Sequence, residues 1–103
     1  MLGSMVSIKA VALRWVSDEP QPGLVEVSII DAFGVDHRIV DKNAVVGPAD
    51  PTLMPDSPYP VDFSIEADAE LDGEDRVTVT LPCFMETTTG ETRLTIAKAD
   101  LLP

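Results

Sequence analysis

Between Leu24 and Val40 the chain reads LVEVSIIDAFGVDHRIV, two runs of alternating apolar and polar residues on either side of a DAFG turn. A period of two is typical of a strand with one buried face and one polar face. The carboxylate of Asp31 can accept backbone N–H groups inside the turn, and Gly34 can adopt the left-handed conformation that a type I turn followed by a bulge requires. The stretch is therefore predicted to be an antiparallel hairpin whose apolar face needs a cover.

The register of this hairpin follows from the length of its loop. A three-residue loop at 32–34 keeps the apolar residues of both strands on one side of the hairpin. The predicted facing pairs are Asp31 with Val35, Ile29 with His37, Ser28 with Arg38 and Val27 with Ile39.

Three later segments show the same alternation. Tyr59–Leu71 alternates throughout, Arg76–Phe84 repeats the pattern, and Thr92–Lys98 follows a turn at 87–90 and carries the apolar pair Leu94 and Ile96. Each is predicted to be a strand.

The segments 59–71 and 76–84 are predicted to pair as a second hairpin. A two-residue turn at Asp72 and Gly73 would set polar residues opposite apolar ones, so this turn is rejected. A loop of three residues, 72–74, or of five, 72–76, restores matching faces; the shorter loop also sets Glu70 opposite Arg76.

The first apolar segment, Val6–Val16, allows two interpretations. As a strand it places Val11, Leu13 and Trp15 on one face, with Trp15 as a core anchor. The spacing of its apolar residues also fits a helix. Its valines and the lack of a helix-starting cap favour the strand.

Two proline-rich stretches separate these segments. The range 17–23 is predicted to be a connecting loop, and the range 47–60 contains five prolines, which excludes both a helix interior and a central strand. Loops of the second length are usually functional or disordered. This one carries Leu53, Met54 and Tyr59, which either pack against the core or contact a partner.

The fold class that follows is all-β, with about six mostly antiparallel strands in a small sandwich or partly open barrel. Residues 5–103 are expected to form one domain. Residues 1–4 precede a second methionine, Met5, and are interpreted as a vector-derived tail.

Charge and cysteine content limit the partners. Eighteen acidic and seven basic residues give a formal charge of -11, which disfavours nucleic acid and anionic membranes. The single cysteine, Cys83, excludes an internal disulfide, and the sequence has neither a signal peptide nor a long apolar run, so a cytoplasmic protein is expected.

The carboxylates concentrate on one predicted strand face. Asp62, Glu66, Asp68 and Glu70 share it, and we expect them either to form a solvated face that discourages edge pairing or to meet a basic protein. The run DAELDG at 68–73 also resembles the first half of a calcium loop, but valine occupies the twelfth position, where a bidentate glutamate is needed.

No residue set indicates an enzyme. His37 and Cys83 both fall on predicted apolar faces, where a core or boundary role is expected. Neither a zinc site, a phosphate-binding loop nor a nucleophile elbow is present in the sequence. We therefore expect no catalytic residue, metal or cofactor.

The stretch ALRWVSDEPQPGLVEVSIIDAFG, Ala12 to Gly34, resembles small uncharacterised all-β proteins of actinobacteria. The resemblance implies a small stand-alone cytoplasmic domain and brings no activity or site residue with it.

The function expected from these features is that of a small acidic protein-binding module without enzymatic activity, of the inhibitor or immunity type toward a basic partner. The residues expected to contact that partner are Asp62, Glu66, Asp68, Glu70, Leu53, Met54 and Tyr59. The alternative is a structural β protein that self-associates as a homodimer.

Overall fold

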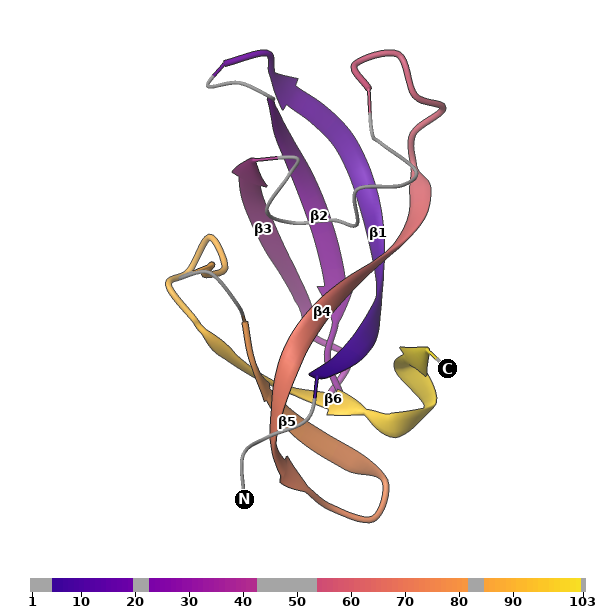
Figure 1. Ribbon diagram of the computed structural model, residues 1–103, viewed down its shortest axis with the longest axis vertical. Coiled ribbons are helices and arrows are strands. Elements are labelled where there is room, and N and C mark those ends of the chain that lie inside the picture. The colour runs from indigo at the N-terminus through magenta and orange to yellow at the C-terminus, as the bar shows by residue number, and fades with distance from the viewer. Residues whose placement is uncertain (1–4, 20–22, 43–53, 82–84, 103) are drawn as a thin grey trace.

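Two long strands, β1 (Met5–Ser17) and β4 (Val61–Asp72), pair antiparallel through the middle of the molecule (Figure 1). The computed structural model describes residues 5–19, 23–42, 54–81 and 85–102. The hairpin of β2 (Leu24–Ile30) and β3 (Asp36–Lys42) continues the sheet beside β1, and the pair β5 (Arg76–Thr80) and β6 (Arg93–Ala97) continues it beside β4.

The strands form one sheet in the order β3-β2-β1-β4-β5-β6, curled into a half-barrel. A short 3-10 helix, η1 (Lys98–Asp100), follows β6 and leads into β7 (Leu101–Leu102), which pairs with β1. The predicted all-β class with about six antiparallel strands is confirmed. The described residues contain no helix of the length and apolarity that crossing a bilayer requires.

The inner face of the half-barrel holds the core. Its members come from alternate positions of the six strands and from the segments that follow β5: Ile8, Ala10, Ala12, Val25, Val27, Ile29, Ile39, Phe63, Ile65, Ala67, Val77, Val79, Leu81, Met85, Leu94 and Ile96. Burying one such Val, Leu, Ile, Phe or Met side chain contributes about 1.5–3 kcal/mol. Outside β1, two-residue periodicity therefore places the core on the face that the sequence predicts.

The β2–β3 hairpin has the predicted register. Ile29 faces His37, and the paired backbone extends to Asp31, whose N–H donates to the carbonyl of Val35 at 2.9 Å. Gly34 has a φ of 81° and donates its N–H to the Asp31 carbonyl at 3.1 Å. The three-residue loop and its left-handed glycine are confirmed.

Strand β1 corrects the predicted face of the first segment. The strand is confirmed, but a bulge between Ala12 and Arg14 leaves Leu13 as an extra residue, so that Trp15 comes to face Val25. Val11 stays on the outer face while Trp15 packs against the core. The prediction that Val11, Leu13 and Trp15 share one face was wrong because the bulge reverses the alternation.

The β4–β5 hairpin has the register of the five-residue loop only in the part farther from the turn. Ala69 faces Val79, and a bulge at Glu70 then shifts the pairing by one residue. The chain turns at 73–75, where the N–H of Gly73 donates to the carbonyl of Arg76 at 2.8 Å. The alternative that set Glu70 opposite Arg76 was wrong, and the five-residue loop was wrong at the turn itself, because the bulge brings Asp72 opposite Val77.

The two edge strands approach each other where the sheet curls. The N–H of Ala32 donates to the carbonyl of Thr95 at 2.8 Å, and the N–H of Thr88 donates to the carbonyl of Arg38 at 2.8 Å. These bonds join the β2–β3 hairpin to β6 and to the segment before it.

Candidate functional site

The outer face of β4 carries the acidic residues that the sequence predicts. Asp62, Glu66, Asp68 and Glu70, which we call the acidic face, are all exposed because the alternate residues of the strand turn inward to the core. Outward residues of a strand follow each other at about 7 Å intervals. The structure therefore brings these four carboxylates into one row.

The arginines of the chain form ion pairs mainly with carboxylates outside the acidic face. The contacts are Arg14 with Glu26 at 2.7 Å, Arg38 with Glu26 at 2.7 Å and with Asp36 at 2.9 Å, Arg93 with Glu70 at 3.0 Å, and Arg76 over the ring of Phe33 at 4.8 Å. Within the described ranges, Asp62, Glu66 and Asp68 take part in no ion pair. Most of the negative charge of the acidic face is therefore not neutralised within that part of the chain.

Met54 and Tyr59 lie in the described part of the proline-rich stretch. Met54 is 51% exposed, whereas Tyr59 packs against the core and donates its hydroxyl to the Met54 carbonyl at 2.7 Å. Burial raises the pKa of Tyr59. Leu53 lies outside the described residues. A self-associating surface built from this stretch stays a prediction.

The calcium-like run falls on a strand. Asp68 and Glu70 belong to β4, where the backbone is extended. A calcium loop instead wraps its oxygens around one ion at about 2.3–2.6 Å. Among the residues that the structure describes, no group of three or more His, Cys, Asp or Glu side chains is placed to hold a metal ion.

His37 is buried, as the sequence predicts, and it lies between two carboxylates. Its Nε2 is 2.7 Å from Asp31 Oδ2, and its Nδ1 is 3.5 Å from Glu91 Oε1. In the described ranges no hydroxyl or thiol hydrogen-bonds to either ring nitrogen, and Cys83 lies outside them. The contacts made by His37 therefore connect the hairpin turn to the segment before β6.

Both carboxylates beside His37 are strongly hydrogen-bonded. Burial acts to raise the pKa of Asp31, but hydrogen bonds from His37 and from the N–H groups of Val35 and Phe33 lower it overall. A hydrogen bond from Thr89 is the main cause of the lowered pKa of Glu91. Both groups are accordingly held in the ionised form.

The sequence pattern does not predict a special role for Glu26. It places this residue only on the polar face of the first hairpin. Glu26 is 9% exposed, and hydrogen bonds from Arg38 and Arg14 lower its pKa against the opposing effect of burial. Arg38 also binds Asp36, whose carboxylate accepts a hydrogen bond from Ser28 at 2.6 Å. The predicted register of the hairpin places Arg38 diagonally opposite Glu26. The contact between these two residues could therefore have been predicted from the sequence.

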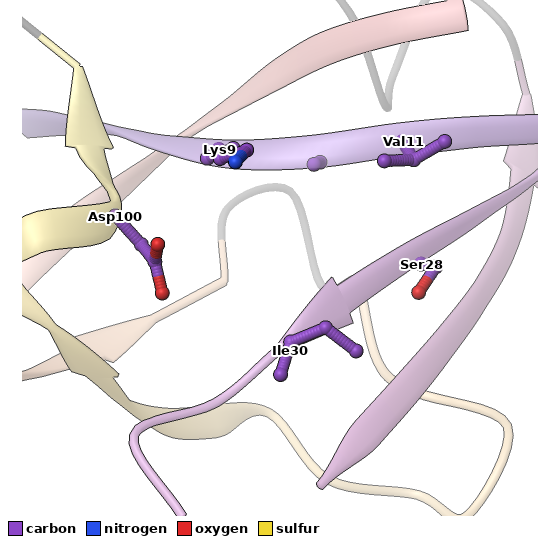
Figure 2. Close-up of a pocket in the computed structure, with 6 residues that line it drawn as sticks. Lys9, Val11, Ser28, Ile30 and Asp100 are labelled. Carbon is purple, nitrogen blue, oxygen red and sulfur yellow. The ribbon is translucent and has the colours of Figure 1, made fainter. Parts of the chain in front are cut away.

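A pocket of about 210 Å³ opens beside β1. Figure 2 shows Asp100 of η1 on one side, Ser28 and Ile30 of β2 on the other, and Lys9 and Val11 of β1 along its edge. No sequence signal predicts it, since it depends on where the pairing of β1 passes from β7 to β2.

The comparisons with known proteins found no relative: the chain matches no family model, no curated protein and no solved structure.

Proposed function

We propose that the chain is a protein-binding module without enzymatic activity, which uses the acidic face of β4 to bind a basic protein. The observation that carries this proposal is the row of exposed carboxylates at Asp62, Glu66 and Asp68, which form no ion pair within the described part of the chain. A partner with lysines or arginines at matching spacing would supply the missing countercharges.

The mechanism is electrostatic. A net charge of -11 speeds encounter with a basic surface, and complementary charges at the contact fix the orientation of the two proteins. β4 lies at the centre of the sheet and pairs with β1 on one side and β5 on the other, so its carboxylates sit on a well-supported strand. Such a face suits an inhibitor that covers the cationic surface of a toxin or nuclease. A reducing compartment such as the cytoplasm suits a chain with one cysteine.

The test compares two triple variants of equal charge. Asp62→Asn, Glu66→Gln and Asp68→Asn neutralise the acidic face, while Glu19→Gln, Glu74→Gln and Glu86→Gln neutralise three exposed glutamates elsewhere. The probe is a fluorescent lysine- and arginine-rich heptapeptide, KRKSKRK, and the readout is its anisotropy.

At about 50 mM salt we expect the first triple variant to weaken binding about tenfold and the second to weaken it much less, because each lost contact contributes about 0.2–1 kcal/mol. Raising the salt to about 300 mM should remove most of the wild-type affinity, since exposed charges are then screened. Equal losses in the two triple variants would show that overall charge, and not this face, attracts the peptide.

A further inference from the structure

The pocket beside β1 lies where that strand changes its neighbour. On the edge away from β4, β1 pairs with β7 at Ser7 and Ile8 and with β2 only from Val11 onward. Lys9 and Ala10 lie between these two pairings and line the pocket. The opening therefore lies in the gap on this edge of β1 between its pairing with β7 and its pairing with β2.

The lining combines an apolar wall with charged groups. Val11 and the half-exposed Ile30 supply the wall, and Lys9 and Asp100 supply one charge of each sign. The hydroxyl of Ser28 is already engaged, because it donates to Asp36. Ile30 is 48% exposed although it belongs to a strand of the sheet, so the pocket leaves apolar surface in water.

The size of the pocket selects the kind of occupant. Sites that enclose drug-sized ligands and cofactors measure about 300–1,000 Å³. A volume of about 210 Å³ is smaller than that, and the pocket is open to solvent on one side. These dimensions suit a single apolar side chain that projects from a larger partner.

The pocket adjoins the acidic face. Val11 faces Asp62 across the β1–β4 ladder, and Lys9 faces Ser64, which lies between Asp62 and Glu66 along β4. Directly opposed side chains on such a ladder have their Cβ atoms about 4.5–5.5 Å apart. One short segment of a partner can therefore reach both the pocket and the carboxylates.

We propose that this pocket receives an apolar anchor side chain of the basic partner, in a segment where basic residues flank the anchor. This inference rests on the function proposed above and adds the chemistry of the bound segment. The anchor packs between Ile30 and Val11, the flanking lysines or arginines meet Asp62 and Asp100, and the ammonium group of Lys9 donates to a backbone carbonyl of the segment. Anchors buried in pockets of this kind dominate the energetics of many protein interfaces.

The test uses two heptapeptides of equal charge, KRKFKRK and KRKSKRK, with titrations followed by anisotropy. We expect the wild-type protein to bind the phenylalanine peptide about tenfold more tightly, and this preference should persist at high salt because apolar burial is not screened. The variant Ile30→Ser should remove the preference. Val40→Ser is the matched control, because Val40 is also exposed but does not line the pocket.

A second variant guards against loss of folding in Ile30→Ser. Val11→Thr keeps the shape and strand propensity of the side chain while making the wall polar, and it should also reduce the preference for phenylalanine. In spectra of the methyl groups, the phenylalanine peptide should shift the resonances of Ile30 and Val11 more than that of Val40.

The outcomes separate the two proposals. If the wild-type protein binds both peptides equally and the acidic-face triple variant loses both, the anchor pocket is refuted while the proposed function stands. If neither peptide binds at low salt, both proposals fail. A phenylalanine preference that survives in Ile30→Ser and Val11→Thr also refutes the pocket, because the anchor then binds elsewhere.

Discussion

The imidazole of His37, on β3, lies with its Nε2 2.7 Å from Oδ2 of Asp31, the residue that begins the hairpin turn. A carboxylate only accepts hydrogen bonds, so the Nε2 carries the hydrogen. The other oxygen, Oδ1, accepts the N–H groups of Phe33 at 2.8 Å and Val35 at 3.0 Å. One carboxylate therefore organises the turn and also satisfies the buried histidine.

Replacing Asp31 tests this double role. Asp31→Ala removes all three hydrogen bonds and leaves the buried Nε2 of His37 without its partner, so we expect a loss of about 2–3 kcal/mol in the free energy of unfolding, measured with urea. Asp31→Asn is the matched control, because its amide oxygen can still accept the turn N–H groups and should preserve more than half of that stability. Equal losses in both variants would mean that the charge, and not the hydrogen bonds, stabilises the turn.

Acid should weaken the interaction of Glu26 with Arg14 and Arg38. The pKa of Glu26 is lower in the folded protein than in the unfolded chain. The unfolded chain therefore binds more protons as the pH falls, and the stabilisation present at neutral pH is lost below about pH 5. Glu26→Gln should cost about 1–2 kcal/mol at pH 7. In urea titrations at pH 3 we expect a smaller difference in the free energy of unfolding between Glu26→Gln and wild type. A difference that stays constant with pH would show that the ionised Glu26 does not stabilise the fold.

Gly23 and Gly34 provide a matched pair of backbone tests. Both have positive φ angles, 118° and 81°, so alanine is strained at either site. A Cβ on Gly23 would lie 2.1 Å from Cζ2 of Trp15, while a Cβ on Gly34 would meet nothing within 4 Å. Gly34→Ala should lower the free energy of unfolding by about 1 kcal/mol, and Gly23→Ala should lower it clearly more.

The single tryptophan reports the difference between these variants. Because Gly23→Ala must displace the Trp15 ring, its fluorescence spectrum should change in the folded state. The spectrum of Gly34→Ala should match that of wild type. An unchanged Trp15 spectrum in Gly23→Ala would contradict the close packing of this ring.

Replacing threonine by valine should destabilise the protein at Thr87 but not at Thr80. The hydroxyl of Thr87 accepts the N–H of Glu91 at 3.0 Å in a buried position, so Thr87→Val should cost about 1–2 kcal/mol. The hydroxyl of Thr80 is buried and has no hydrogen-bond partner among the described residues. Thr80→Val should therefore leave the melting temperature unchanged or raise it. A lower melting temperature for Thr80→Val would reveal a partner for this hydroxyl.

The hairpin from Leu24 to Val40 shows what can be predicted from this sequence. Its turn contains both Asp31 and Gly34, which together favour a three-residue loop, and that loop keeps the apolar residues on one side and pairs Ile29 with His37. The exposed carboxylates of β4 were predictable for the same reason. In both cases local alternation and tertiary burial favour the same arrangement.

The remaining features depend on contacts that a periodicity argument does not contain. In β1 both faces are rich in apolar residues, so nothing in the pattern marks Leu13 as the bulged residue. The contact of Arg14 with Glu26 requires the register that this bulge creates. The pocket at Lys9 depends on the pairing of β1 with β7, a strand of two residues that no alternation in the sequence marks.

The pairing of Ser7 with Leu102 joins positions near opposite ends of the described chain. During synthesis on a ribosome, β1 emerges before β7, so this part of its edge gains the neighbour that the structure describes only after Leu102 has left the exit tunnel. Contacts so distant in sequence form slowly, because a long loop must close first. The nascent chain therefore keeps an open strand edge, of the kind that molecular chaperones shield, until Leu102 has emerged from the ribosome.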